Sequence, residues 1–305
     1  MQNETVEVGL RGKFYRVKTV RIGDKQIIIN GKLIKIASIH DERFNELENP
    51  LEFIKELNKI RKLADVFTFR QKFPETKRNF NFYMESDDIA AVHLDSYEHW
   101  FKKQISENAR RGIKKALKEG VTIKNVHFDD EFIRGMVEIF NEEPLKQNKP
   151  NWNYGKSFET VKREFSKYLN RQEHIGAYYN NELIGFIFLT YSDRYAEMTQ
   201  IISKVSHQDK SPNNALIAEA VKICTKKGIP YLVYGMWTRG LLTEFRRRNG
   251  FKKLSIPRYY IPLTNKGKFI IYFHLHKGLA GLIPEKMIRI LINLRTRWYT
   301  KKYKK

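Results

Sequence analysis

Two histidines separated by one residue form the pattern in this sequence that most directly suggests metal chemistry. His274 and His276 flank Leu275, so a strand through this segment would present both imidazoles on one face. Imidazole is a common ligand of zinc, but a site needs further ligands, and the sequence brings none into register. We therefore expect structural histidines and predict no metal site. The single cysteine, Cys224, follows the apolar face of its helix and is expected in the core.

Sequence patterns that would identify other reactions are not present. The chain contains no Ser-His-Asp arrangement, no phosphate-binding P-loop and no dinucleotide-binding glycine pattern. One cysteine excludes a disulfide framework and a cysteine-based zinc site.

The net charge is the strongest compositional signal. Lysine and arginine number 57 against 34 aspartate and glutamate, which gives a formal charge of +23. Nucleic acid, an anionic membrane or a phosphorylated substrate would be natural partners of such a surface. The alternative is a general bias toward Lys, Asn and Ile, with most lysines simply solvated.

Length and hydropathy indicate the kind of protein. A chain of 305 residues predicts about two domains, and 41% hydrophobic residues are enough for a buried core. No apolar run approaches the ~18 residues that cross a bilayer. Residues 1–4 do not resemble the start of a secretory signal. We therefore expect a cytoplasmic protein without a transmembrane segment, with membrane association left open.

The first 119 residues are predicted to be rich in strands. Alternating apolar residues and two turn dipeptides indicate an antiparallel meander over residues 13–38. Asn49 and Pro50 are typical of a helix start. Further strands are expected at 66–69 and 89–94, with a loop over 74–86 between them. A long basic helix is expected from Ser96 to Glu119.

From residue 121 the order of the expected elements becomes informative. The patterns predict the order β-α-α-β-β-β-α-β-α-β-β. The strands are expected at 121–127, 174–179, 182–191, 195–204, 231–234, 252–262 and 269–275. The helices are expected at 129–140, 157–169, 213–227 and 241–248.

This order resembles the GNAT fold of N-acetyltransferases, over residues 120–276. In that fold two neighbouring parallel strands splay apart, and the acyl donor and acceptor meet in the cleft. Trp237 and Arg239 follow the fifth strand at its carboxyl end, where open α/β sheets bind ligands, and are expected as pocket walls. Trp152, in the loop between the first two helices of this unit, would cover the acceptor or pack against the N-terminal half.

Several segments resemble the FemABX-type peptidyltransferases. Phe245-Arg246-Arg247-Arg248-Asn249-Gly250-Phe251 resembles their Phe-Lys-X-X-Phe-Gly turn, so Arg246 joins the predicted pocket. The helix-to-strand junction at 108–121, the helix start at 212–220, the strand at 227–235 and the strand at 259–263 also resemble that family. These segments occur in the family's order.

The resemblance implies an acyl- or aminoacyltransferase that acts on an amine. Typical FemABX members move an amino acid from aminoacyl-tRNA to the peptide of a lipid-linked peptidoglycan precursor, and their fold holds two GNAT-like halves. We therefore expect an α+β (mixed α/β) chain with a GNAT-like domain at 120–276. Residues 1–119 would form a smaller, strand-rich and partial first half, and residues 277–305 a basic helix. The coiled-coil arm of some members has no counterpart here.

The expected donor turn departs from the GNAT pattern. GNATs that use acetyl-CoA have a glycine-containing turn before the helix, whose backbone N–H groups bind the pyrophosphate. Here that turn, residues 207–214, contains no glycine. The donor is therefore either an aminoacyl-tRNA or an acyl-CoA, with the missing glycine against the second. Lys210, Asn213 and Asn214 are the residues expected to meet its phosphate.

Candidate acid–base groups are few. Acyl transfer to an amine needs a neutral amine and a proton returned to the leaving group. Many GNATs keep a general base on the fourth strand, where Glu197 lies in this sequence. Tyr234, near the expected splay, and Tyr259 or Tyr260 are candidate proton donors. The alternative is a solvent-facing glutamate and ordinary strand tyrosines.

Residues 284–305 are predicted to form a basic amphipathic helix. Met287, Ile290, Leu294 and Trp298 recur at spacings of three and four, and no acidic residue follows Glu285. Such a helix can dock on the protein, lie on an anionic membrane or bind tRNA. The alternative function is therefore a non-catalytic GNAT scaffold that binds nucleic acid or an anionic membrane through its basic surface.

Overall fold

The computed structural model describes residues 4–10, 13–60, 63–146, 149–238 and 240–277, together with 287, 290, 294 and 297. It groups the chain into two compact units: Met1–Asp87 with Ser255–Lys305, called the first unit, and Asp88–Leu254, called the second unit. Strands β6 (Tyr83–His93) and β14 (Lys252–Pro262) contribute residues to both. The domains expected from the sequence, with boundaries after residues 119 and 276, remain a prediction.

The first unit contains a mixed sheet in the order β1-β2-β3-β4-β5-β14. Neighbours are antiparallel except β4 and β5, which are parallel. The other elements are β1 (Glu4–Leu10), β2 (Lys13–Ile22), β3 (Lys25–Asn30), β4 (Ile36–Ile39), α1 (Pro50–Asn58), β5 (Val66–Arg70), α8 (Asn265–Tyr272) and the 3₁₀ turn η4 (Leu275–Lys277). The meander predicted over 13–38 is confirmed.

Aromatic side chains of β5 and β14 form the centre of the first unit's core. Phe67, Phe69 and Tyr259 are fully buried there. The hydroxyl of Tyr259 donates to Gln71 Oε1 at 2.6 Å and accepts the backbone N–H of Asn79 at 2.9 Å. Tyr259 thus ties the 74–82 loop to the sheet.

The second unit contains a mixed sheet in the order β6-β13-β12-β11-β10-β7. Only β12 and β13 are parallel neighbours; the other pairs are antiparallel. Its strands are β7 (Thr122–Val126), β10 (Gln172–Tyr179), β11 (Glu182–Tyr191), β12 (Ala196–Ser203) and β13 (Tyr231–Met236), with the short pair β8 (Leu145–Lys146) and β9 (Lys149–Pro150). Its helices are α2 (Tyr97–His99), α3 (Glu107–Lys118), α4 (Asp130–Asn141), α5 (Phe158–Phe165), α6 (Pro212–Lys226) and α7 (Leu241–Arg248), with the 3₁₀ turns η2 (Leu169–Arg171) and η3 (Val205–Lys210).

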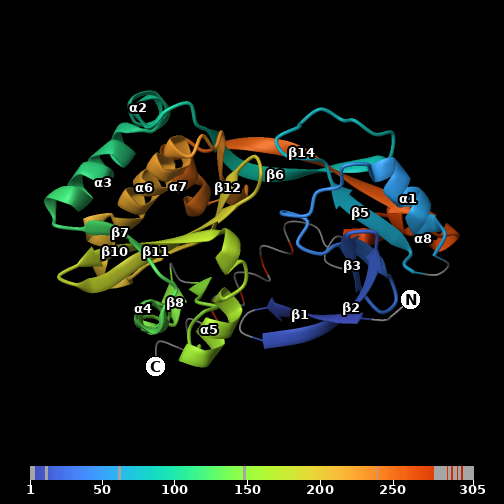
Figure 1. Ribbon diagram of the computed structural model, residues 1–305, viewed down its shortest axis with the longest axis horizontal. Helices are drawn as coiled ribbons and strands as arrows, with labels where there is room; N and C mark the ends of the chain where they lie inside the picture. The colour runs from blue at the N-terminus through green and yellow to red at the C-terminus, as the bar shows by residue number, and fades with distance from the viewer. Residues whose placement is uncertain are drawn as a thin grey trace. The chain divides into compact units, whose positions relative to one another are not determined.

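Helices cover both faces of the second unit's sheet. Figure 1 shows α3 and α6 on one face of the strands and α4 and α5 on the other. The side chains of β11 alternate accordingly: Ile187 and Leu189 pack with the residues of α3 and α6, whereas Phe186 and Phe188 pack with those of α4 and α5. Burial on both faces explains why β11 is apolar at nearly every position.

One predicted strand is wrong. Residues 269–275 were expected to be extended, but Asn265–Tyr272 form helix α8. Thr264 caps this helix, since its hydroxyl accepts the backbone N–H of Gly267. Ile270 and Ile271 are buried, with Gly267 one turn earlier, while Phe269 and Tyr272 are exposed. This burial has the period of a helix, and the cap three residues before Gly267 was the overlooked signal.

The long helix predicted from Ser96 to Glu119 is interrupted. After α2, residues Trp100–Gln104 form one π-helical turn, and Ile105 is extended. Ser106 then caps α3 by accepting the backbone N–H of Ala109. Trp100 is fully buried, and its indole N–H donates to the Asn249 carbonyl, which fixes this bend against the end of α7.

The remaining order of elements from β7 to β14 agrees with the prediction, and the mixed α/β fold is confirmed.

Within the described part of the chain, no helix has both the length and the apolar character of a membrane span. Most of the predicted tail helix, 284–305, lies outside the described residues. Met287, Ile290, Leu294 and Arg297 are described, as helical and exposed.

Replacing Tyr259 with Phe should destabilise the first unit, because the buried Gln71 Oε1 and the Asn79 N–H each lose their hydrogen bond with the Tyr259 hydroxyl and keep only the bond to each other. The expected loss in the free energy of unfolding is about 1 kcal/mol. Tyr260→Phe is the matched control, since that hydroxyl has no hydrogen bond with a described residue; its effect should stay within about 0.5 kcal/mol. Urea unfolding of both variants checks this, and equal losses would contradict the structural role of Tyr259.

Candidate active site

The sheet of the second unit opens between β12 and β13. The two strands pair only at Ala196 with Leu232 and at Glu197 with Val233. Beyond these positions they diverge, and a cavity of about 370 Å³ lies at the opening. It is lined by the end of β12 (Ile201, Ile202, Ser203), the following turn and α6 (Gln208, Ser211, Pro212, Asn213, Asn214), Tyr234 of β13, and α7 (Leu241, Leu242, Phe245).

The turn before α6 has an unusual backbone. Ser211 adopts the left-handed conformation with φ of 57°, and its side chain makes no capping hydrogen bond. The Ser211 N–H donates to the Gln208 carbonyl and the Asn214 N–H donates to the Ser211 carbonyl. The turn therefore uses these backbone donors internally, although serine occupies a conformation that glycine adopts more easily.

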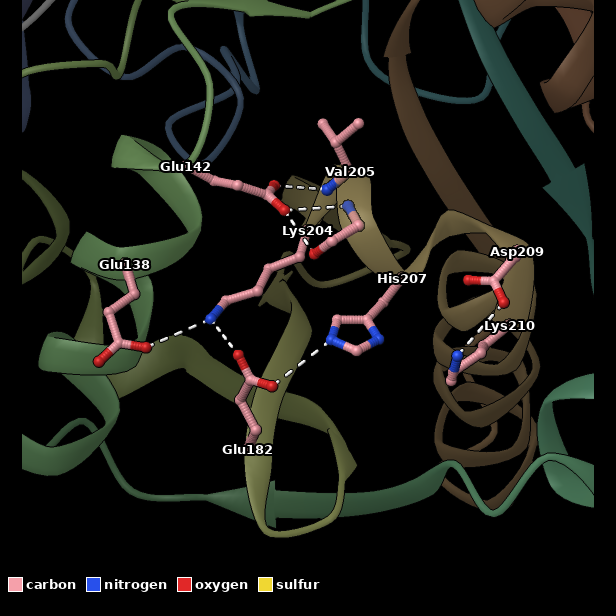
Figure 2. A network of polar contacts seen from close by, with 9 residues as sticks. Glu138, Glu142, Glu182, Lys204, Val205, His207, Asp209 and Lys210 are labelled. Atoms are coloured by element: carbon pink, nitrogen blue, oxygen red, sulfur yellow. Dashed lines mark hydrogen bonds and ion pairs between the residues drawn. The ribbon is translucent and has the colours of Figure 1, made fainter.

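Three glutamates and a lysine anchor this turn to the rest of the unit (Figure 2). The carboxylate of Glu142, at the end of α4, accepts the backbone N–H groups of Val205 and Ser206 and the Ser206 hydroxyl. Lys204 is buried and pairs with Glu138 and Glu182. These bonds link the turn to α4 and β11 and hold the cavity rim in place.

The same network includes one imidazole. Figure 2 shows the ring of His207 turned toward Glu182, with its Nε2 3.4 Å from the carboxylate. Glu182 thus contacts both a lysine and a histidine. The pKa of its carboxyl is lowered, and the largest cause is the hydrogen bond from Lys204. The carboxylate is therefore charged at neutral pH and holds both partners.

A buried arginine lies against the tyrosine of the cavity. Arg246 is 5% exposed, and its Cζ is 4.6 Å from the centre of the Tyr234 ring. Its Nη1 donates to the Met236 carbonyl at 2.6 Å. Its Nε is buried and has no hydrogen-bond partner among the described residues. Burying a charged group without an opposite charge costs free energy, so this guanidinium lacks an expected partner.

The buried lysines of the second unit, in contrast to Arg246, have acidic partners. Lys204 pairs with Glu138 and Glu182, and Lys156 pairs with Glu164 at 2.6 Å. Arg246 makes no ion pair with a described acidic residue. Arg246 therefore differs from these lysines in that no described acidic residue neutralises its charge.

Tyr234 is a neutral donor beside this charge. Burial raises the pKa of Tyr234 to about 12, although the nearby Arg246 acts in the opposite direction. The phenol therefore keeps its proton at neutral pH. Its hydroxyl makes no hydrogen bond with a described residue, so a ligand in the cavity could accept one.

The cavity contains two of the three predicted donor-binding residues. Asn213 and Asn214 line it. Asn214 Nδ2 donates to Asn249 Oδ1 at 3.2 Å, which ties α6 to the end of α7, whereas Asn213 Oδ1 is buried without a partner among the described residues. Lys210 is not part of the lining: its ammonium pairs with Asp209 and lies over the Tyr179 ring.

The other predicted site residues lie outside the lining. Glu197 is buried on β12, at the position where the strands still pair. Trp237 follows β13 and packs against the core, and Trp152 is exposed in the loop after β9. Tyr259 belongs to the first unit. Arg239 lies outside the residues that the structure describes.

Sequence reasoning missed several cavity residues. Gln208 and Ser211 were passed over because the turn was judged by its missing glycine. Leu241 and Leu242, at the start of α7, are exposed apolar neighbours at the cavity. Two adjacent leucines at the beginning of a short helix, where an amphipathic pattern buries only one, were the available signal.

Several solved structures have a similar fold. FemX superposes with a TM-score of 0.54 at 11% identity, covering 84% of this chain and 87% of FemX. The L-PGS of Bacillus licheniformis reaches 0.55 at 14% identity, covering 85% and 88%. The C-terminal domain of a protein assigned as lysylphosphatidylglycerol synthetase from Agrobacterium fabrum reaches 0.55 at 12% identity, covering 85% and 88%.

These likenesses concern the fold. They show a fold like that of FemX, which is the fold predicted from the resemblance of the sequence. No protein-family model and no curated protein matches the sequence.

Replacing Glu142 with Ala should loosen the turn before α6, because three hydrogen bonds to a carboxylate are lost. Amide hydrogens of residues 205–211 should exchange faster, and the free energy of unfolding should fall by about 1–2 kcal/mol. Glu143→Ala is the control, since that side chain makes no hydrogen bond or ion pair with a described residue. Hydrogen exchange measured by mass spectrometry tests this prediction. Equal exchange rates of the 205–211 amides in the two variants would contradict the anchoring role of Glu142.

Proposed function

We propose that this protein is an acyl- or aminoacyltransferase that transfers an acyl group to an amine in the cavity between β12 and β13. The observation that carries the proposal is the pair of Tyr234 and Arg246. A neutral phenol on the cavity wall lies against a buried guanidinium that has no acidic partner among the described residues. This is the arrangement that a reaction with a developing oxyanion requires.

The chemistry follows from these two groups. The acceptor amine attacks the acyl carbon, a C–N bond forms, and the carbonyl oxygen becomes negatively charged. Tyr234 can donate a hydrogen bond to this oxygen, and the positive charge of Arg246 stabilises it through the ring contact. The bond to the leaving group then breaks, and the proton lost by the amine goes to the leaving oxygen or sulfur.

The scheme does not use Glu197, the residue predicted as general base. Glu197 lies where β12 and β13 still pair and is not part of the lining. In this scheme Tyr234 keeps its proton in the hydrogen bond to the oxyanion, and the proton of the amine passes to the leaving group. Trp152, Trp237 and Arg239 remain predictions for the acceptor side.

An aminoacyl-tRNA suits the turn before α6 better than an acyl-CoA. Pyrophosphate binding requires free backbone N–H groups at this turn. Here Ser211 and Asn214 donate theirs within the turn, and Glu142 takes those of Val205 and Ser206. Asp209 adds a carboxylate at the same turn, although Lys210 pairs with it. The FemABX resemblance of the sequence favours the same donor.

A non-catalytic polyanion binder is the second candidate. Lys114, Lys115 and Lys118 are exposed on α3 and make no ion pair with a described acidic residue. α3 also packs beside the turn before α6. A phosphate backbone would suit this helix whether or not the cavity is catalytic.

Peripheral membrane contact through 284–305 is likewise a proposal, to which the exposed Met287, Ile290 and Leu294 contribute.

Donor choice can be tested by binding. A ligand that binds only the native state raises the melting temperature. We expect charged tRNA to raise the Tm of the full chain more than deacylated tRNA at equal concentration, and acetyl-CoA to leave it unchanged. Equal shifts with charged and uncharged tRNA would favour the non-catalytic binder, and a shift with acetyl-CoA alone would reverse the donor assignment.

Catalysis can be tested with radiolabelled aminoacyl-tRNA and a lysine-containing peptide or hydroxylamine as the amine. Tyr234→Phe and Arg246→Gln should each lower the transfer rate by about 10²-fold, because each removes one stabilising group from the oxyanion. Arg247→Gln is the control, since Arg247 is exposed and pairs with Glu244. Tyr234→Phe also keeps the ring, so its Tm should stay close to that of the parent chain.

Two outcomes would overturn the assignment. One is full transfer activity in Tyr234→Phe, which would remove the phenol from the mechanism. The other is an equal loss in Arg247→Gln, which would point to a general effect of positive charge on tRNA binding. A normal Km for tRNA with a reduced kcat in Arg246→Gln separates the oxyanion role from binding.

A further inference from the structure

A cluster of metal-ligating side chains lies in the first unit, outside the cavity described above. His276 follows α8, and Glu85 lies on β6, 191 positions earlier in the chain. One ligand atom each from Glu85, His274 and His276 lie within 4.8 Å of one another. The sequence supplied two imidazoles without a third ligand, and the fold supplies a carboxylate.

The cluster converges on a single oxygen atom. His276 Nε2 is 3.1 Å and His274 Nδ1 is 4.0 Å from Glu85 Oε1. The Tyr83 hydroxyl is 3.0 Å from both Glu85 Oε1 and His274 Nδ1. Two nitrogen ligands, a carboxylate and a phenol thus surround one small volume, with no second acidic side chain from the described residues.

The backbone and the core hold the two imidazoles in this arrangement. His274 has a φ of 56°, the left-handed region that a residue with a Cβ adopts infrequently. His276 is buried, with its side chain 1% exposed, and its ring centre lies 4.4 Å from that of Tyr260. His276 is therefore a preformed ligand, while His274, whose side chain is 56% exposed, can adjust.

We propose that Glu85, His274 and His276 bind one divalent transition metal ion, with zinc as the ion that suits them best. Zinc takes histidine nitrogen at ~2.0–2.1 Å and carboxylate oxygen at ~2.0–2.2 Å, so two of its tetrahedral ligands lie about 3.3 Å apart. The 3.1 Å between His276 Nε2 and Glu85 Oε1 is close to this separation. His274 Nδ1 has to approach Glu85 by less than about 1 Å.

The carboxylate is already in the form that a metal needs. Burial raises the pKa of the Glu85 carboxyl, but hydrogen bonds from Lys277, Tyr83 and His276 lower it by more. The pKa of Glu85 is therefore below its ordinary value. The group is therefore an anion at neutral pH. Metal binding requires deprotonated ligands, and this ligand needs no proton removed.

Lys277 is the competitor of the metal ion. Its ammonium lies 2.9 Å from Glu85 Oε1, the oxygen that the ion would use, and the side chain is 46% exposed. A flexible, half-exposed lysine can swing into solvent when a doubly charged ion takes its place. The two cations share one oxygen, so removing the lysine should tighten metal binding. An ion-paired cluster without a metal function would not show this response.

The test is calorimetric titration of the full chain, without a histidine tag, with Zn²⁺, and visible absorption after loading with Co²⁺. Glu85→Gln and His274→Ala should each weaken binding by at least about tenfold and reduce the Co²⁺ absorption. Lys277→Ala should tighten binding by about three- to tenfold. His99→Ala is the control, because it also removes an imidazole next to a carboxylate, that of Asp95, and should change nothing.

The variants avoid the buried His276, so failure to fold does not decide the result. The Tm of each metal-free variant should stay near that of the parent chain. Zn²⁺ should raise the Tm of the parent chain, of His99→Ala and of Lys277→Ala, and should raise the Tm of Glu85→Gln and His274→Ala less. Zn²⁺ affinity that is the same in the parent chain and in the double variant Glu85→Gln/His274→Ala overturns the proposal. So does an affinity that Lys277→Ala leaves unchanged. Neither result bears on the transferase proposal, which concerns residues of the second unit.

Discussion

The parallel pairing of β12 and β13 ends after two positions, and the second unit is organised around that divergence. Backbone groups that leave a sheet need other partners, because an unpaired buried N–H or C=O is costly. The Met236 carbonyl accepts Arg246, and the Trp237 N–H donates to the Asp88 carbonyl. The gap that remains between the strands is the cavity, and its wall includes the first turn of α6 and the beginning of α7.

Charge is distributed unevenly around this opening. Acidic side chains hold the turn before α6 from behind: Glu142 accepts its backbone N–H groups, and Glu138 and Glu182 neutralise Lys204. Beside the Tyr234 ring of the cavity wall, Arg246 donates to one backbone carbonyl and leaves its Nε without a described partner. This charge, held in place without a described acidic partner, is the basis of the proposed oxyanion role, because a preorganised donor needs little reorganisation when negative charge develops.

The elements of the fold were largely predictable because their signals are local. Strand β14 was predicted at residues 252–262, where the structure has it, and the order from β7 to β14 followed from periodicity and caps. Three expectations differ from the structure. The loop expected over 74–86 ends earlier, because β6 begins at Tyr83. The other two differences have one cause: Thr264 and Ser106 are caps inside segments that were interpreted by their apolar pattern alone, so α8 was taken for a strand and the bend before α3 was missed.

The sequence by itself determined the class of the fold, the topology of the GNAT-like part and the position of the turn before α6, since these depend on neighbours along the chain. It also selected Asn213, Asn214 and Tyr234, which line the cavity. Only the tertiary structure decided that Arg246 is buried without an acidic partner among the described residues, and that Glu85 meets the two histidines. Both facts depend on which side chains the fold packs together, and for Glu85 and His276 this packing spans 191 positions of the chain. Packing of this kind leaves no periodic signal in the sequence.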